Sequence, residues 1–274
     1  MNICFIGGGN MATALIGGLL GKGIAAQKIS VVEINADSRA RLQHDFAVHA
    51  VETVTEGIAG SQIIILAVKP QQLRDVAKQL ASMLSGQLLI SIAAGIRAVD
   101  LSRWTNSQAI VRAMPNTPAL IRSGMTGIYA LPAVTGSQRE EAQNILAAAG
   151  KTLWVQEEAM LDAVTAISGS GPAYVFYFIE ALQRAARELG LNAEEARRLS
   201  LETFLGASKL AACSNEDVSV LRARVTSKNG TTERALLSMD ANHIAEHIVQ
   251  AAKAAEARAH EMGDELGDNS KGNP

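Results

Sequence analysis

The chain has 274 residues, of which 48% are hydrophobic and 19% are charged. This length suits two domains, and the apolar content is sufficient to bury a core, so a disordered chain is excluded. The 25 Lys and Arg residues nearly balance the 27 Asp and Glu residues, so the net charge is −2, and we expect neither nucleic acid nor a membrane as a partner.

The first part of the chain alternates between short strand-like runs and helical segments. Strands are predicted over residues 3–6, 29–33, 63–68, 88–92 and 109–111, with helices over 11–22 and 36–45. The run 63–68 is apolar on both faces, as is typical of a strand covered by helices on each side. This order predicts an α/β fold with a Rossmann-type, doubly wound parallel sheet.

The character of the sequence changes after Val155, where runs of strand length end. Helices are predicted over residues 157–167, 173–189, 193–212 and 242–262. The helix 173–189 is apolar around much of its circumference, which predicts burial in a bundle or at a subunit interface. We therefore expect an α/β domain over 1–156 and an all-α domain over 157–274, with a frayed tail from residue 263.

Cysteine usage and the N-terminal segment predict a cytoplasmic protein. Cys4 and Cys213 are far apart and form no CxxC motif, which favours reduced thiols. The apolar stretch before Lys22 lacks a basic start and is interrupted by three glycines, so neither a signal peptide nor a membrane span is expected.

A glycine-rich motif follows the first predicted strand. Gly7, Gly9 and Ala12 form G-x-G-x-x-A directly before a predicted helix. Gly7 allows the tight turn, Gly9 lets the backbone approach a pyrophosphate, and Ala12 lets helix and strand pack closely. The free N–H groups where the helix begins, near Asn10, would bind the phosphates. The first domain is therefore predicted to bind a dinucleotide.

The ends of the predicted strands should form the wall of this cofactor site. Glu33 would accept hydrogen bonds from the adenosine ribose and favour NADH, whereas Asn35, Ser38 and Arg39 offer an alternative grip on the 2′-phosphate of NADPH. Lys69 is expected to contact phosphate or begin a helix, and a catalytic lysine is the alternative. The predicted cofactor-binding residues are Ile6, Gly7, Gly8, Gly9, Asn10, Met11, Glu33, Ala67, Val68, Lys69, Pro70, Ala93, Ala94, Gly95, Pro115 and Asn116.

Six segments carry a resemblance to a known family. They read GGGNM at 7–11, AVKP at 67–70, SIAAG at 91–95, RAMPNTPA at 112–119, SGSGPAY at 168–174 and VTSKNGTT at 225–232. Together they resemble pyrroline-5-carboxylate reductase over nearly the whole chain. The resemblance implies reduction of 1-pyrroline-5-carboxylate to L-proline by NADPH or NADH, the final step of proline biosynthesis. It also implies a homo-oligomer, a dimer at least, in a family whose dimers often assemble into decamers.

The 227–232 loop is predicted to bind the substrate. Its hydroxyl and N–H groups, leading into a helix, suit a carboxylate held by Ser227, Gly230 and Thr231. The hydroxyl of Thr232 would then point at the ring nitrogen as the catalytic group. The resemblance places Ser170, Gly171 and Pro172 beside the pyrroline ring. Many family members read S-P-G-G-x-T here, so Lys228 and Asn229 are departures, and the His-Pro pair common before the loop is absent from 215–218.

Two other functions remain as alternatives. A 3-hydroxyacid dehydrogenase-like enzyme would place a lysine and an asparagine on the helix after the Gly-Ser corner, but residues 174–188 contain neither. A non-catalytic dinucleotide-sensing module would bind the cofactor without needing the 227–232 loop. The H-x-x-E-H pattern of His243, Glu246 and His247 matches a zinc motif, but we interpret these as exposed helix residues and expect no metal.

Overall fold

The computed structural model describes residues 1–267, and these form two compact units. The first unit comprises residues 1–170 together with the described residues from 254 onward. The second unit comprises residues 171–253. The final helix of the described chain thus contributes residues to both units.

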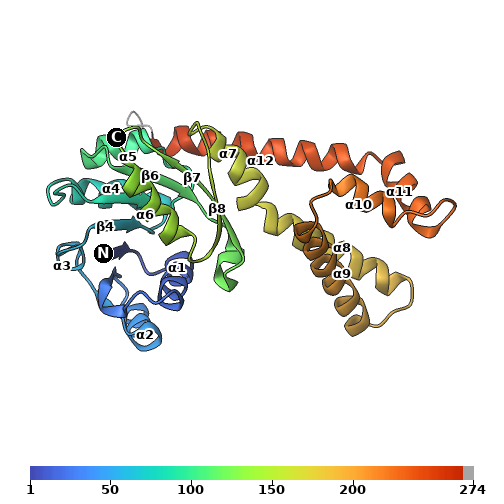
Figure 1. Ribbon diagram of the computed structural model, residues 1–274, viewed down its shortest axis with the longest axis horizontal. Helices are drawn as coiled ribbons and strands as arrows, with labels where there is room; N and C mark the ends of the chain where they lie inside the picture. Colours follow the sequence, from blue (N-terminus) through green and yellow to red (C-terminus); the bar gives the residue numbers. More distant parts are fainter. Residues whose placement is uncertain (268–274) are drawn as a thin grey trace, which may run out of the picture. The chain divides into compact units, whose positions relative to one another are not determined.

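The first unit is built on a sheet that has eight strands within the described residues (Figure 1). The strand order is β3-β2-β1-β4-β5-β6-β7-β8, and neighbours pair in parallel except β6 and β7, which are antiparallel. The strand order reverses between β1 and β4, which is where doubly wound sheets bind ligands. The strands are β1 (Ile3–Ile6), β2 (Ile29–Val32), β3 (His49–Val51), β4 (Ile63–Leu66), β5 (Leu88–Ser91), β6 (Ile110–Met114), β7 (Gly124–Ala130) and β8 (Gly150–Trp154).

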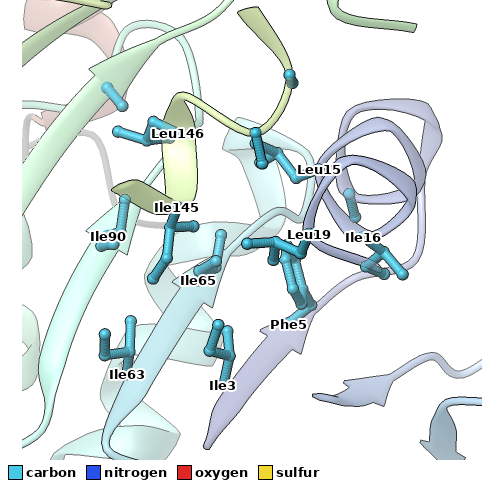
Figure 2. Packing of buried hydrophobic residues seen from close by; sticks show 14 of the residues in the cluster. Ile3, Phe5, Leu15, Ile16, Leu19, Ile63, Ile65, Ile90, Ile145 and Leu146 are labelled. Carbon is cyan, nitrogen blue, oxygen red and sulfur yellow. The ribbon is translucent and has the colours of Figure 1, made fainter. Parts of the chain in front are cut away.

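Helices cover both faces of this sheet. Because side chains alternate along a strand, Ile3 and Phe5 of β1 lie in one core, whereas Cys4 and Ile6 lie in the other. Figure 2 shows the first core, where side chains of β1 and β4 lie against Leu15 of α1 and its neighbours. The helices are α1 (Asn10–Gly21), α2 (Ala36–Phe46), α3 (Val54–Gly57), α4 (Pro70–Ala81), α5 (Ala98–Thr105), α6 (Gly136–Leu146) and α7 (Met160–Val164), with 3-10 turns at Ala26–Lys28 and Thr117–Ile121. The Rossmann-type prediction is confirmed.

Three strands and one antiparallel pairing were not predicted from the sequence. β3 is short, β7 contains two glycines, and the side chains of β8 are all half-buried or exposed, so none presents a long apolar run. Gly124 brings the backbone of β7 close to its neighbours: a Cβ there would lie 2.8 Å from the carbonyl oxygen of Ala149. Backbone proximity, rather than apolar patterning, therefore defines this edge of the sheet.

A buried ion cluster ties β6 to the chain that follows β8. Arg112 lies in the middle of β6, is only 5% exposed, and donates to Glu158 Oε1 at 2.9 Å. Its second nitrogen lies 3.8 Å from Asp162 Oδ1. The same Glu158 oxygen accepts the N–H of Ala98 at 2.6 Å, where α5 begins. We call Arg112, Glu158 and Asp162 the Arg112 cluster; the sequence signal for it is an arginine inside an otherwise apolar strand.

The last described turns of the chain are helical, which corrects the expected frayed tail. Helix α12 (Ile244–Gly267) continues through Gly263, whose missing Cβ leaves room for the Arg97 side chain. Arg97 pairs with Asp264 at 2.7 Å, and Arg103 donates to the carbonyl oxygen of Gly267 at 2.9 Å. These contacts hold residues 263–267 against α5; the rest of the predicted tail, 268–274, lies outside the described residues.

The second unit is helical, as predicted. Its elements are α8 (Gly171–Glu188), α9 (Ala193–Cys213), α10 (Val218–Arg224), α11 (Thr231–Ala241) and the first part of α12. Asn192 begins α9 with a reciprocal capping box: its side chain accepts the Glu195 N–H at 3.0 Å, and the Glu195 carboxylate accepts the Asn192 N–H at 2.9 Å. The predicted helix 157–167 is instead the short α7 followed by a π-helical turn, Thr165–Gly169.

Apolar side chains of the second unit remain largely exposed in a single chain. Its only buried residues within the described chain are Ile179, Ala196 and Ser200. Phe176 is 60% exposed and Tyr177 is 71% exposed, both on α8. Such a large apolar surface is typical of a subunit interface. Within residues 1–267, no helix combines the length and the apolar run that a membrane crossing requires.

Candidate active site

The loop between β1 and α1 is shaped by close backbone contacts. Gly7 has a φ of +101°, and a Cβ on it would lie 2.7 Å from the carbonyl oxygen of Ala67, just after β4. Its N–H donates to the carbonyl oxygen of Val32 at 2.8 Å. Gly9 is the N-cap of α1 with a φ of −70°, and a Cβ there would meet nothing within 4 Å. The first turn of α1 therefore presents N–H groups beside an open surface, which suits a phosphate.

A cavity of about 810 Å³ adjoins this loop at the carboxyl ends of β1, β2 and β4. Its size falls within the range of about 300–1,000 Å³ that is usual for ligand sites. The predicted residues that line it are Ile6, Gly7, Gly8, Gly9, Glu33, Ala67, Val68 and Lys69. Wall residues that the sequence reasoning missed include Ile34, Glu52, Thr53 and Asp75. Ile34, Glu52 and Thr53 follow the ends of β2 and β3, which is the pattern that could have identified them, whereas Asp75 lies in the middle of α4.

Both carboxylate oxygens of Glu33 accept backbone hydrogen bonds. Oε2 accepts the N–H of Gly8 at 3.0 Å, and Oε1 accepts the N–H of Asn35 at 2.9 Å. The Asn35 side chain in turn accepts the N–H of Ser38 at 2.8 Å and thereby caps α2. Glu33 thus braces the glycine loop, and the oxygen of Asn35 is already engaged.

Arg39 is held by three acceptors near the same wall. It donates to the carbonyl oxygens of Glu33 and Ile34, each at 2.8 Å, and pairs with the Glu52 carboxylate at 2.9 Å. The cavity wall itself carries Glu33, Glu52 and Asp75 against a single lysine, Lys69. This end of the cavity is therefore acidic.

The remaining predicted cofactor residues lie outside that wall. Asn10 and Met11 form the first turn of α1, and Pro70 opens α4 with Lys69 as its N-cap. The 93–95 loop follows β5; Ala93 is buried, and a Cβ on Gly95 would lie 3.2 Å from that of Met262 on α12. Pro115 and Asn116 follow β6, and the Asn116 side chain is bonded to Ser168 and Met125. A cofactor role for these residues stays a prediction.

The SGSG corner is a π-helical turn rather than an open Gly-Ser turn. The N–H of Ser170 donates to the carbonyl oxygen of Thr165 at 2.8 Å, five residues back. Helix α8 then begins at Gly171, two residues before the predicted start, with Pro172 in its first turn. The corner therefore continues the helical path from α7, which the glycine and serine content did not indicate.

The 227–232 loop leads directly into α11. Asn229 has a φ of +59°, so it takes the left-handed conformation expected for a residue that replaces glycine. Its N–H donates to the Glu233 carboxylate at 2.7 Å, and the N–H of Gly230 donates to the carbonyl oxygen of Ser227 at 3.0 Å. The Glu233 carboxylate thus closes this turn, although the sequence analysis did not single it out. A glutamate three residues after an N-cap is the pattern that could have predicted this contact.

These two bonds leave fewer free donors in the loop than the sequence suggested. Thr231, Thr232 and Glu233 form the first turn of α11 after the N-cap Gly230. The N–H groups of a first turn have no partner within their own helix, so they stay available to an anion. Thr231 is exposed and Thr232 is half-buried.

Both units contain segments that match known protein families. The model of the pyrroline-5-carboxylate reductase dimerisation family matches residues 158–262, and that of the coenzyme F420-dependent NADP oxidoreductase family matches residues 2–95. Pyrroline-5-carboxylate reductase of Pseudomonas aeruginosa is 45% identical over 97% of this chain and 98% of its own, and that of Haemophilus influenzae is 42% identical over 95% and 97%. The chain belongs to the pyrroline-5-carboxylate reductase family.

Solved structures agree with this assignment. The Coxiella burnetii pyrroline-5-carboxylate reductase superposes with a TM-score of 0.91 at 39% identity, covering 95% of this chain and 98% of that one. The Plasmodium falciparum enzyme, solved with NADP bound, gives a TM-score of 0.85 at 29% identity, covering 96% and 98%. Like its family, the chain reduces 1-pyrroline-5-carboxylate to L-proline with NADPH or NADH, as the motifs indicated.

The zinc-like pattern of this reductase is not a continuous helix face. His243 has a φ of +52° and precedes α12, so it lies at the junction after α11 rather than on a helix as interpreted from the sequence. Its carbonyl oxygen accepts the N–H of His247 at 3.0 Å, so His243 directly precedes the first turn of α12 and His247 lies within that turn. Within residues 1–267, no group of three or more His, Cys, Asp or Glu residues is arranged to hold a metal ion.

Proposed function

We propose that the cavity beside Gly7 holds the nicotinamide dinucleotide, with its pyrophosphate at the first turn of α1. This placement of the pyrophosphate rests on the open surface at Gly9 and on the neighbouring N–H groups of α1, which have no partner within the helix. Ile34 lines the cavity and is 75% exposed, so it offers an apolar surface for the adenine. The proposed cofactor contacts are Ile6, Gly7, Gly8, Gly9, Asn10, Met11, Glu33, Ala67, Val68, Lys69, Pro70, Ala93, Ala94, Gly95 and Pro115. Asn116, the last residue of the predicted set, is left out because its side chain is hydrogen-bonded to Ser168 and Met125.

The acidic wall supports a preference for NADH over NADPH. A 2′-phosphate near Glu33 would meet its carboxylate, and Glu52 already neutralises Arg39. The ribose diol of NADH would instead donate to Glu33. This preference runs against the NADPH preference frequent in the family and follows from the side chains that this chain carries after β2.

The cofactor preference is tested by following nicotinamide absorbance with pyrroline-5-carboxylate and each cofactor. We expect kcat/KM with NADH to exceed that with NADPH about tenfold, the factor that about 1.4 kcal/mol of repulsion produces. The variant Glu33→Gln should narrow this ratio, because it removes the charge and keeps an acceptor oxygen. Glu56→Gln, an exposed acid outside the cavity wall, is the matched control. A wild-type preference for NADPH would contradict the proposal.

We further propose that the 227–232 loop holds the substrate carboxylate through Ser227, Gly230 and Thr231. Thr232 then directs its hydroxyl at the ring nitrogen, where it orients the imine and relays a proton. Ser170, Gly171 and Pro172 are proposed to line the pyrroline ring. When bound, the reduced cofactor supplies the hydride; this chain holds the imine carbon in position to receive it and keeps the carboxylate anchored.

Removal of the Thr232 hydroxyl tests the proposed catalytic role. We expect Thr232→Val to lower kcat about 10²-fold, the usual effect of losing one positioned hydrogen-bond donor. Thr232→Ser keeps the hydroxyl and should restore most of the rate. The dissociation constants of NADH and NADPH, measured by cofactor fluorescence, should be the same in all three proteins. Full turnover by Thr232→Val would exclude the role, and a parallel loss of cofactor affinity would point to a general disturbance of the fold.

The exposed apolar surface of the second unit supports a homodimer with interleaved helices from two chains. Further assembly of dimers into a decamer is proposed from the family resemblance alone, and sedimentation equilibrium measures the subunit number.

We propose that the boundary between the dinucleotide-binding domain and the helical domain lies near residue 156, which the start of the dimerisation-family match at 158 supports. We also propose a cytoplasmic location, which the two free and widely separated cysteines, Cys4 and Cys213, support.

A further inference from the structure

The carbonyl oxygen of Ser168 loses its helical partner because of a proline. In an α-helix, the carbonyl of one residue accepts the N–H of the residue four positions later. For Ser168 that residue is Pro172, which has no N–H. A proline ring also crowds the carbonyl four residues before it, which is a usual cause of a widened or kinked helix. The π-helical turn Thr165–Gly169 occupies this stretch.

The side chain of Asn116 supplies the missing donor. Its Nδ2 lies 3.2 Å from the carbonyl oxygen of Ser168 and 3.2 Å from the Ser168 hydroxyl. Its Oδ1 accepts the N–H of Met125, at the start of β7, at 2.9 Å. Because a backbone N–H can only donate, Met125 sets the orientation of the amide and leaves Nδ2 facing Ser168. The half-buried Asn116 thus joins the loop after β6, the start of β7 and the π-helical turn.

These bonds lie where the chain leaves the first unit. The division between the two compact units falls between Ser170 and Gly171, directly after the π-helical turn. Ser170, Gly171 and Pro172, which we have proposed to line the substrate ring, begin two residues after Ser168. A π-helical turn inside a helical segment is frequently found at functional sites.

We propose that Asn116 is a positioning residue for the substrate corner, acting through the Ser168 carbonyl, and that it does not contact the cofactor. This inference rests on the proposed substrate role of residues 170–172 and replaces the cofactor role that the sequence suggested for Asn116. Its NH2 group and its oxygen are both engaged in hydrogen bonds that hold the turn. Loss of the Asn116 NH2 group leaves the Ser168 carbonyl oxygen without this partner, so residues 170–172 can shift.

The isosteric variant Asn116→Asp tests the donor directly. It keeps an acceptor for the Met125 N–H but places a carboxylate oxygen against the Ser168 carbonyl. We expect kcat/KM for pyrroline-5-carboxylate to fall about 10–100-fold, the scale of a misplacement near 1 Å. The NADH dissociation constant should stay within about twofold, because no cofactor contact is lost. A rise in that constant matching the loss of activity would overturn the proposal.

Restoration of the backbone donor provides the decisive test. In Asn116→Ala/Pro172→Ala, residue 172 regains an N–H that can bond to the Ser168 carbonyl. The loss caused by Asn116→Ala should therefore shrink from about 10–100-fold in the parent to about 2–3-fold in the Pro172→Ala background. A merely structural role, lost through general loosening, would give equal losses in both backgrounds, and that result would also overturn the proposal. If Asn116→Ala does not fold, Asn116→Ser takes its place in the cycle.

Two further variants separate this inference from the proposed substrate role. Ser168→Ala removes the hydroxyl contact but keeps the carbonyl, so activity should stay within about twofold of the wild type. A loss as large as that of Asn116→Asp would assign the effect to the hydroxyl and overturn the carbonyl mechanism. Ser170→Ala tests the proposed function itself: an unchanged KM for pyrroline-5-carboxylate would contradict a substrate role at the corner, whatever the coupling between Asn116 and Pro172.

Discussion

Alanine at Gly9 is expected to weaken cofactor binding while leaving the stability of the cofactor-free protein unchanged. Gly9 has an ordinary φ of −70°, and a Cβ there would meet no protein atom within 4 Å. The added methyl group therefore meets no steric obstacle until a pyrophosphate approaches the backbone, and the poorer capping by alanine is offset by the smaller conformational freedom of the unfolded chain. We expect the NADH dissociation constant to rise about tenfold or more, which corresponds to about 1.4 kcal/mol. Cofactor fluorescence and thermal unfolding measure the two quantities separately.

Gly7→Ala is the matched variant, and unlike Gly9→Ala it should lower the stability of the cofactor-free protein. Its φ of +101° and the 2.7 Å approach of a Cβ to the Ala67 carbonyl oxygen place the cost in the cofactor-free fold. Backbone strain of about 1–3 kcal/mol adds to a similar cost of overpacking, so both stability and cofactor binding should fall. Equal stability losses in the two variants would contradict this account of the glycine loop. Retained NADH affinity in Gly9→Ala would mean that the pyrophosphate does not lie at that residue.

Arg112→Met is expected to destabilise the fold more than any surface charge substitution. Arg112 is 5% exposed, and its removal leaves the Glu158 carboxylate without its arginine and leaves Asp162 with only the exposed His260, 3.6 Å away, as a partner. Breaking a buried ion pair from one side usually costs about 3–5 kcal/mol, whereas an exposed pair contributes about 0–1 kcal/mol. Urea unfolding at one fixed protein concentration measures the difference, since the stability of an oligomer depends on concentration.

Two controls make this test specific to the Arg112 cluster. Arg258→Met removes an exposed arginine that pairs with Glu261 and Glu265, and it should change stability by about 1 kcal/mol or less. The double variant Arg112→Met/Glu158→Gln should recover part of the loss, because one unpaired charge is removed with its partner. A loss in Arg112→Met no larger than in Arg258→Met would show that water or other groups compensate the buried carboxylates.

The sequence was most informative where one local pattern determines one local structure. Apolar runs of strand length located β1, β2, β4, β5 and β6, because strands buried on both faces need apolar side chains throughout. The Gly7 turn followed from its motif, since only glycine takes its conformation readily. The antiparallel β7 and the edge strand β8 escaped prediction because glycines and half-exposed side chains leave no such run.

By itself, then, the sequence determined the fold class, the family, the dinucleotide motif and the long helices α8, α9 and α12, because each depends on residues close together in the chain or on long matching segments. Only the tertiary structure decided what Asn116, Glu33 and Arg112 do. Asn116 meets Ser168, Glu33 meets Gly8, and Arg112 meets Glu158 across gaps of 52, 25 and 46 residues. Partners this distant are chosen by how strands and helices pack in space, and no local pattern records that choice.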